Sequence, residues 1–379
     1  MRTSHARAIT PPLAQPNSMS CKDAICVGVL CVILTLGLWP FHSPENEVAW
    51  LVNRNGLQFG RYGTVPGSGA FHMENEASVS IEVWLQPLRV WDSSTILTFY
   101  TPGNPSRFSL RQSLAGLEVK NAARLYVSNV FRRRGPVFLT IASGIHGTAV
   151  YTNGVLIRLA PQFRPFPGAF AGRLVLGDST GQPDSWSGDL LGLAIYRREL
   201  TGAQVLRHYE TWKHAERPEI AEEDGSVAPY LFNERTGNVV HDQAGSGASL
   251  YIPERYAVLD KIFLEPFWTE FSMSRSYWDS AFKNIVGFIP FGFCFCACLS
   301  AHKLRRAALA TVILGTLVSL TIEILQAYLP TRDSGTTDLF TNTLGTYIGV
   351  ATWSVLSPIL AARFPRLPFV SSTPGPHAN

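Results

Sequence analysis

The stretch SLTIEILQAYLPTRDSGTTDLFTNTLGTYIG, residues 319–349, places polar side chains within two apolar runs. It joins the end of one run, residues 307–329, to the start of another, residues 339–362, through a short polar link. Each run is long enough to cross a bilayer as a helix, which takes about 20 residues. Charged and amide side chains are costly in such helices, so they are the most informative residues of the chain.

Two further apolar runs come before this stretch. Residues 284–301 are long enough for a span, whereas residues 24–41 lie near the lower limit. The run at residues 24–41 follows Arg2, Arg7 and Lys22, so it could be a signal peptide. We expect an uncleaved anchor instead, because the following LWPFHSPE has no A-x-A-like cleavage site. The sequence therefore predicts an α-helical transmembrane bundle of about four helices.

The short links between the runs predict the orientation. HKLRR, residues 302–306, is strongly basic, while residues 331–338 are near neutral. The positive-inside rule puts the basic link in the cytoplasm. With four spans the tails, residues 1–23 and 363–379, are also expected inside. Residues 42–283 are then extracytoplasmic, on the outer side of a bacterial cytoplasmic membrane.

Residues 45–260 have the mixed composition of a folded soluble domain. From residue 48 to 213, short stretches rich in β-branched and aromatic residues are separated by Gly, Pro, Asn and Asp. Asn153-Gly154 in VYTNGVLI predicts a tight hairpin turn, because both residues accept positive φ angles. This pattern predicts an all-β sandwich of two sheets.

Several motifs together resemble laminin-G-like domains of the concanavalin A-like lectin/glucanase fold, a jelly-roll sandwich. These motifs are IEVWLQP, YTNGVLI, GRLVLGD and WSGDLLGLAIYRRELTGAQVLRHY. The family usually opens with a strand similar to PYLFNERTGNVVHDQAGSGASLYIP, residues 229–253, which here follows the expected closing helix. The resemblance implies that residues 229–253 supply a permuted strand. Residues 261–283, rich in aromatic side chains, are expected to be an interfacial connector.

The sandwich offers few candidates for catalysis. A glucanase of this fold needs two carboxylates, normally in an E-x-D-x-x-E strand, and Glu82 stands alone in IEVW. We therefore do not expect a glycosidase. Tyr100, Trp91 and Trp186 are candidate glycan-binding residues, although a place in the core or at its rim is the commoner role of such side chains.

Metal and cofactor sites are weakly indicated. Three aspartates in one loop, Asp178, Asp184 and Asp189, could bind calcium, although solvated turn carboxylates are commoner. The six cysteines all lie in or beside apolar runs. Three of them, Cys294, Cys296 and Cys298, alternate too closely to share a helix face, and no His-bearing motif accompanies them. We expect no metal site there, and no cofactor.

A polar cluster is expected at the outer ends of the last three apolar runs. Glu323 and Gln326 share one helix face, and Gly345 and Gly349 follow the polar residues of the last run at helical spacing, which permits close helix contact. Pro290 is expected to break its helix. The members of the polar cluster are Asn284, Glu323, Gln326, Arg332, Asp338 and Asn342.

These residues resemble the VanZ-like family, which is named for a teicoplanin-resistance protein. The matching stretches are NIVGFIPFGF, residues 284–293, and residues 319–349, with Asp279 and LWPF, residues 38–41. The resemblance implies a sandwich inserted between the first two VanZ-like helices.

The cluster has two interpretations. It could be interhelical glue, in which each polar group satisfies another. It could also be a site for a lipid-linked headgroup, with Glu323 as the acceptor, Arg332 as the countercharge, and Asp338 and Asn342 as orienting groups.

Dispersed arginines disfavour nucleic-acid binding. The leading hypothesis is a non-catalytic envelope protein that contacts membrane lipid through its helices. Its lectin-like domain would bind a glycan or a peptidoglycan-related, glycopeptide-like ligand, which could alter susceptibility to glycopeptide antibiotics. One alternative is a membrane enzyme or carrier acting on a lipid-linked substrate at the Glu323 cluster. Another is a sandwich that serves as a protein–protein interaction module.

Overall fold

The computed structural model describes residues 20–73, 76, 78–165, 168–214, 224–245, 247–271 and 275–363. Residues 1–19 and 364–379 of the expected cytoplasmic tails lie outside the described residues. The chain divides into two compact units. A helical unit holds Met1–Trp39, Glu265–Ile324 and Gly335–Asn379, and a sandwich unit holds Pro40–Leu264 and Leu325–Ser334.

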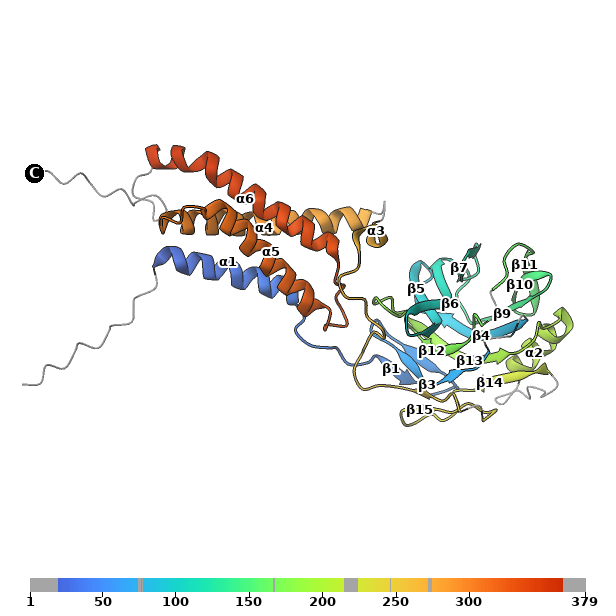
Figure 1. Ribbon diagram of the computed structural model, residues 1–379. Helices are drawn as coiled ribbons and strands as arrows, with labels where there is room; N and C mark the ends of the chain where they lie inside the picture. The colour runs from blue at the N-terminus through green and yellow to red at the C-terminus, as the bar shows by residue number, and fades with distance from the viewer. Residues whose placement is uncertain are drawn as a thin grey trace, which may run out of the picture. The chain divides into compact units, whose positions relative to one another are not determined.

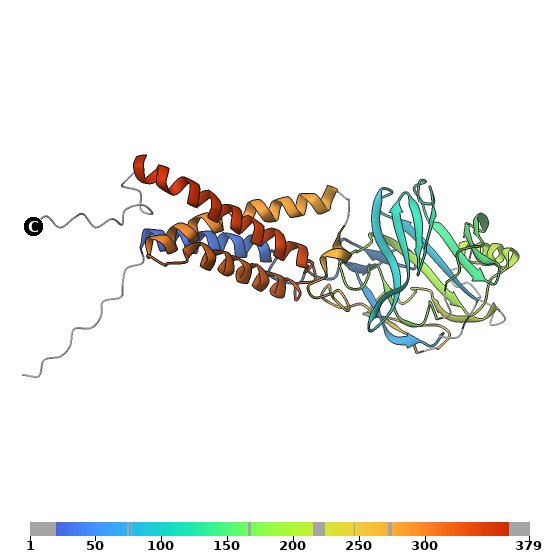
Figure 2. The ribbon, with the colours of Figure 1, turned by 45° about the horizontal axis from the view of Figure 1, so that its top comes forward.

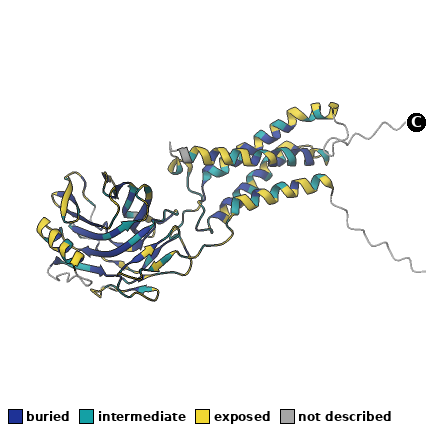
Figure 3. Ribbon diagram, turned by 180° about the vertical axis from the view of Figure 1, so that it is seen from behind, coloured by how far each residue is buried: buried dark blue, intermediate teal, exposed yellow. Residues whose placement is uncertain are grey.

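The described part of the helical unit contains four long apolar helices. They run side by side (Figures 1 and 2). Each is long and apolar enough to cross a membrane. Their outward faces are exposed and carry large apolar side chains such as Ile313, Leu317 and Val355, as a lipid-facing surface requires (Figure 3). The helices of this unit are α1 (Cys21–Leu38), the short α3 (Phe267–Glu270), α4 (Arg275–Ala301), α5 (Ala307–Gln326) and α6 (Thr336–Arg363).

Glycines set the closest approach between α4 and α6. A Cβ added at Gly345 or Gly349 would lie 2.2 Å from a backbone carbonyl oxygen of α4, and one at Gly292 would lie 2.0 Å from the carbonyl of Thr346. Small residues let two helix backbones touch where lipid supplies no hydrophobic driving force. The close helix contact predicted at Gly345 and Gly349 is therefore confirmed.

Helix α4 differs from its prediction in two ways. It begins at Arg275 rather than near residue 284, because the intervening residues contain neither Gly nor Pro. The break expected at Pro290 was wrong, since α4 continues through this residue. A proline removes one backbone hydrogen bond, which a transmembrane helix tolerates when packing against its neighbours holds it.

The sandwich unit consists of two antiparallel sheets, so the predicted all-β sandwich beside about four apolar helices is confirmed. A large apolar core lies between the sheets, with Phe59, Phe99 and Trp186 fully buried. The first sheet has the order β1-β2-β13-β4-β9-β10-β11, with β14 also paired to β13. Its strands are β1 (Val48–Trp50), β2 (Leu57–Phe59), β4 (Val79–Pro87), β9 (Val137–Gly144), β10 (Gly147–Thr152), β11 (Val155–Ala160), β13 (Gly188–Tyr196) and β14 (Ser226–Tyr230).

The second sheet has the order β15-β16-β3-β12-β5-β6-β7-β8. Its strands are β3 (Val65–Phe71), β5 (Asp92–Thr101), β6 (Asn104–Leu114), β7 (Gly116–Lys120), β8 (Arg124–Val127), β12 (Gly172–Leu176), β15 (Val239–Val240) and β16 (Leu250–Tyr251). The late segment therefore contributes to both sheets, because β14 pairs with β13 while β16 pairs with β3.

Local sequence accounts for two connections in the first sheet. Asn153 and Gly154 adopt φ angles of 50° and 79° between β10 and β11, so the predicted tight hairpin turn is confirmed. Helix α2 (Gly202–His214) starts with a capping box, in which Gln204 Oε1 accepts from the Thr201 amide and Thr201 Oγ1 accepts from the Gln204 amide. The helix packs Val205 and Trp212 against the outer face of the first sheet.

Candidate functional sites

One member of the predicted polar cluster, Glu323, lies against the N-terminus of α6. Glu323 is only 1% exposed, and its Oε2 accepts a hydrogen bond of 2.9 Å from the Gly335 amide. Glu270 Oε2 accepts a second bond of 2.9 Å from the Thr337 amide, and the Thr336 amide donates to the Glu265 carbonyl. A helix N-terminus leaves its first amides without intrahelical acceptors and carries partial positive charge, so two carboxylates there are stabilising.

Glu270 is the member of this arrangement that sequence reasoning missed. It belongs to FWTE in α3, where the aromatic side chains indicated only a connector. The available signal was a carboxylate within an aromatic, interface-like segment. A Cβ added at Gly335 would collide with the Glu270 carboxylate, so a larger residue there would require the Glu270 side chain to move.

A second polar contact joins α5 and α6. Asn342 Nδ2 donates to Ser319 Oγ over 3.0 Å, one turn of α5 before Glu323. Among the described residues, Asn342 Oδ1 and Asn284 Nδ2 have no hydrogen-bond partner, although both atoms are buried. Asn342 and Glu323 thus lie along one face of the α5–α6 contact. On α4, Asn284 precedes Ile285, whose carbonyl faces Gly345 of α6. Asp338 is half-buried in the first turn of α6.

The other two members of the predicted cluster belong to the sandwich unit. Gln326 is buried and Arg332 is half-buried, and both side chains have partners. Lys261 Nζ donates to the carbonyls of Gln326 and Leu329, which caps the C-terminal end of α5. Burial lowers the pKa of Lys261 to about 8.

The three candidate aromatic residues differ in exposure. Trp186 is buried in the core, where its Nε1 donates to Gln112 Oε1 over 3.0 Å. Tyr100 is 4% exposed, so neither ring offers a face to a sugar. Trp91 is 70% exposed and is the accessible ring of the three.

The three candidate aspartates each have protein donors. Asp178 is fully buried, with Oδ1 accepting from the amides of Ser179 and Asp184 and Oδ2 accepting from Tyr256 over 2.6 Å. Burial raises the pKa of Asp178 to about 7. Asp184 pairs with Arg111 and Asp189 pairs with Arg54. The contacts that the structure gives these carboxylates are therefore with protein donors.

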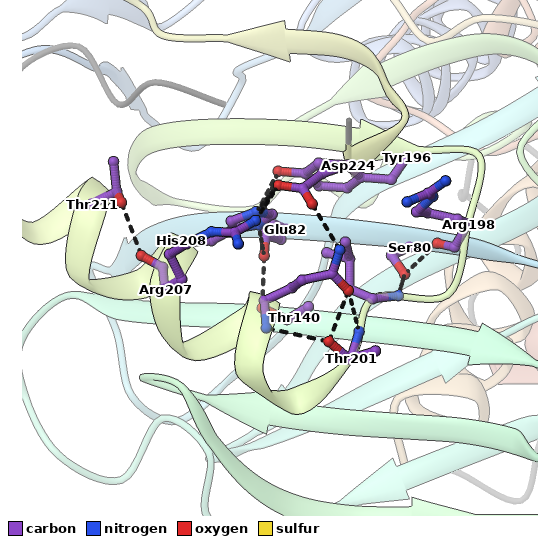
Figure 4. A network of polar contacts seen from close by, with 12 residues as sticks. Ser80, Glu82, Thr140, Tyr196, Arg198, Thr201, Arg207, His208, Thr211 and Asp224 are labelled. Carbon is purple, nitrogen blue, oxygen red and sulfur yellow. Dashed lines mark hydrogen bonds and ion pairs between the residues drawn. The ribbon is translucent and has the colours of Figure 1, made fainter. Parts of the chain in front are cut away.

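Sequence reasoning also missed a buried ionic network between α2 and the first sheet (Figure 4). The His208 ring lies between two carboxylates, with Nδ1 3.0 Å from Glu82 Oε1 and Nε2 2.9 Å from Asp224 Oδ2. Tyr196 donates to Glu82 Oε2 over 2.6 Å. Burial by itself lowers the pKa of His208, but the two carboxylates outweigh burial and raise it. Glu82 is 0% exposed, so it fastens α2 to the sheet and cannot reach a substrate.

The outer surface of the sandwich contains a basic groove of about 940 Å³. Four guanidinium groups line it, those of Arg132, Arg133, Arg134 and Arg158. No acidic side chain lines it, and none of the four guanidinium groups has an ion-pair or hydrogen-bond partner within the described part of the chain. Arg134 also lines a neighbouring groove of about 720 Å³, which contains Gln58, Gln86 and Asp189.

The local backbone explains why these arginines point outward. Phe131 is 1% exposed, and its amide donates to the Ala115 carbonyl, so the loop between β8 and β9 is anchored in the core just before the three arginines. Gly135 has a φ of 139°, which turns the chain into β9 immediately after them. Arg158 faces the groove from β11, beyond the Asn153-Gly154 turn. The arginine run is visible in sequence, whereas its partner Arg158 is not.

These observations define a multi-pass membrane protein that combines a helical bundle with a β-sandwich. Residues 233–357, about a third of the chain, match the model of the VanZ/LLP1 family. The C-terminal part of the chain is therefore a VanZ/LLP1 domain. The match includes β15, β16, α4, α5 and most of α6, and it leaves α1 and β14 outside. No curated protein matches the chain significantly.

Three solved structures illustrate the weak similarity. One is a botulinum neurotoxin type C structure concerned with two ganglioside molecules, at 16% identity, a TM-score of 0.33, and coverage of 44% of this chain and 46% of that chain. A putative carbohydrate binding protein from Bacteroides ovatus has 13% identity and a TM-score of 0.39, and the match covers 57% of this chain and 62% of that chain. A SAP-like pentraxin from Limulus polyphemus has 14% identity and a TM-score of 0.34, and the match covers 56% of this chain and 96% of that chain. The chain spans about half the length of the neurotoxin chain it matches.

Proposed function

We propose that this membrane protein binds an anionic envelope glycan in the arginine-lined groove of its sandwich, without catalysing a reaction. The observation that carries the proposal is the set of four guanidinium groups around one concavity, none of which has a partner among the residues that the structure describes. Like charges held together repel one another, and a phosphate- or carboxylate-bearing polymer would relieve that repulsion through charge-assisted hydrogen bonds. Neutral polar atoms of the neighbouring groove would contact sugar hydroxyls.

The proposed orientation follows from the four helices and the basic link between α4 and α5. Residues 302–306 carry Lys303, Arg305 and Arg306, so the positive-inside rule favours the cytoplasm for this link. An even number of spans then puts the sandwich on the opposite side, facing the bacterial envelope. A ligand on that side is a glycan of the wall or of a lipid-linked precursor.

Binding of three polymers to the full-length protein in detergent tests the groove. A poly(glycerol phosphate) and a polygalacturonate should bind, and a neutral dextran should not. The Arg133→Ala/Arg158→Ala variant should bind the anionic polymers at least about 10-fold more weakly, because each lost charge-assisted bond contributes roughly 1.5–3 kcal/mol. The Arg164→Ala/Arg197→Ala variant changes the net charge equally at exposed sites outside the groove, and should bind like the wild type. Equal losses in the two variants would contradict the groove.

A second function is favoured by the two unpartnered amide atoms of the helical unit. Asn284 Nδ2 and Asn342 Oδ1 are buried without partners among the described residues. They could bind a polar headgroup, which would make the helical unit a carrier or enzyme for a lipid-linked substrate. A deletion strain that is altered in susceptibility to cell-wall antibiotics, including glycopeptides, would supply the assay. Asn342→Ala should then fail to complement at normal protein levels, whereas full complementation would exclude this role.

A further inference from the structure

A cluster of three metal-ligand side chains lies where α1 and α4 meet. Cys298 Sγ is 3.3 Å from Asp23 Oδ1, and His302 Nε2 is 3.1 Å from the same oxygen. One ligand atom from each residue falls within 4.8 Å of the others. Within the described residues this is the one such group of three or more. Neither the groove nor the α6 cap involves it.

Helix geometry brings these side chains together. Asp23 and Cys26 are three residues apart on α1, so they share a face. Cys298 and His302 are four apart, and the His302 amide donates to the Cys298 carbonyl, so the helical spacing persists past the end of α4 at Ala301. Lys303 then turns the chain away with a φ of 59°. Each helix therefore presents a pair of donors toward the other helix.

Cys26 lies beside the three, outside the group whose donor atoms all fall within 4.8 Å of one another, and its thiol donates to the Cys294 carbonyl over 3.5 Å. Its side chain is 5% exposed, and its thiol neighbours that of Cys298. The described cysteines form no disulfide. The set of two thiols, one imidazole and one carboxylate is a donor combination typical of zinc sites.

The two donor-atom distances to Asp23 Oδ1 are close to those around a tetrahedral zinc ion. Zinc bond lengths of about 2.3 Å to sulfur, 2.0–2.1 Å to nitrogen and 2.0–2.2 Å to oxygen imply separations of roughly 3.6 Å between sulfur and oxygen and roughly 3.4 Å between nitrogen and oxygen. The observed 3.3 Å and 3.1 Å are each shorter by about 0.3 Å. A small outward movement of the side chains would therefore admit the ion. Two charged ligands, the Asp23 carboxylate and one thiolate, would neutralise it.

We propose that Asp23, Cys298 and His302, completed by Cys26, bind a divalent transition metal of the Zn²⁺ class that links α1 to α4. The link has a structural purpose. Helix α1 is separated from α4 in sequence by the whole sandwich, and the side chains that pack it against the bundle, such as Ile33 with Phe288 and Ile322, are apolar. Apolar packing discriminates poorly between helix partners in lipid. Metal ligation would fix which helix α1 joins and at which depth.

Titration of the reduced full-length protein with Co²⁺ in detergent tests the site, because thiolate ligation to Co²⁺ gives a charge-transfer absorption band. One equivalent should bind, and Zn²⁺ should displace it. Cys298→Ser and His302→Asn should each weaken Zn²⁺ binding at least about 100-fold. Cys31→Ser removes an exposed thiol of α1 outside the cluster and should leave both spectrum and stoichiometry unchanged.

Thermal unfolding in the presence and absence of Zn²⁺ provides the second readout. Zn²⁺ should raise the Tm of the wild type and not that of His302→Asn. The His302 side chain is 58% exposed, so its replacement should leave the metal-free fold intact even if Cys298→Ser does not fold. Absence of a stoichiometric thiolate–Co²⁺ band would overturn the proposal. A band or Zn²⁺ stabilisation that survives in both ligand variants would do the same.

Discussion

At the scale of single residues, the free-energy cost of burying a charge explains why the buried carboxylates have hydrogen-bond donors or ionic partners. Glu323 stood out in the sequence because a carboxylate within an apolar run must find a donor, and it is buried with one. The identity of that donor could not be predicted, since it is a backbone amide 12 residues further along the chain. Glu82 was not expected to be catalytic, because its strand contains no second carboxylate. Its partner His208 lies 126 residues away in the sequence, so no short sequence motif contains both residues.

The contact of Glu323 with the N-terminus of α6 predicts a graded loss of stability. Glu323→Gln keeps an acceptor for the Gly335 amide but loses the charge, so we expect a cost of about 1 kcal/mol. Glu323→Ala leaves the amide buried and unpaired, which should cost about 2–3 kcal/mol. Unfolding of the full-length protein in detergent measures both, with Thr321→Val on the exposed face of α5 as the control. Wild-type stability in both variants would disprove the cap.

Asp178 predicts a pH dependence of the sandwich. Its folded pKa of about 7 exceeds the ordinary 3.8, so the folded state binds the extra proton. The resulting stabilisation is complete below pH 3.8 and is lost as the pH rises through 7. Asp178→Asn keeps an acceptor for the two amides without the ionisation. Between pH 5 and pH 8 it should lose less stability than the wild type, by at most about 3 kcal/mol, in chemical denaturation. Parallel curves for the two proteins would refute this.

The network of Glu82, His208 and Asp224 predicts non-additive substitutions. His208→Leu leaves the buried Glu82 carboxylate without its main partner and should cost about 3–5 kcal/mol. Adding Glu82→Leu removes the uncompensated charge, so the double variant should be more stable than His208→Leu alone. Chemical denaturation of the single and double variants measures the coupling. Costs that simply add would show that the pair does not interact.

At the scale of elements, hydropathy and turn chemistry were sufficient to predict most of the structure. The four apolar runs correspond to α1, α4, α5 and α6, and the Asn153-Gly154 turn lies where it was predicted, because both signals are local in sequence. The errors also have local causes. Helix α4 continues through Pro290 because packing against α6 replaces what the missing hydrogen bond would have contributed.

The contact between α4 and α6 predicts opposite outcomes at two glycines of the same helix. Gly292→Ala places a methyl group against the Thr346 carbonyl and should cost about 1–3 kcal/mol. Gly287→Ala meets nothing within 4 Å and should stabilise α4 by about 0.5–1 kcal/mol. Thermal unfolding in detergent compares them. Equal behaviour of the two variants would contradict the close approach at Gly292.

At the scale of the whole molecule, the chain nests one domain within another. The sandwich occupies the sequence between α1 and α4, yet the VanZ/LLP1 match begins at residue 233, between β14 and β15. Composition predicted the two kinds of domain because soluble and lipid-facing segments differ so strongly. The arginine groove was not predicted, because only folding adds Arg158 to the contiguous run at residues 132–134. The α1–α4 ligand cluster was not predicted either, because only folding brings Asp23 to Cys298 and His302.

Polymer binding to sealed membrane vesicles of known orientation tests the central claim most directly. The probe is a labelled poly(glycerol phosphate), which cannot cross the bilayer. Vesicles with the outer face exposed should bind it through the full-length protein, inside-out vesicles should not, and Arg133→Ala/Arg158→Ala should abolish the difference. Binding to inside-out vesicles, or equal binding by this variant and by Arg164→Ala/Arg197→Ala, would contradict an outward-facing sandwich that recognises an anionic glycan.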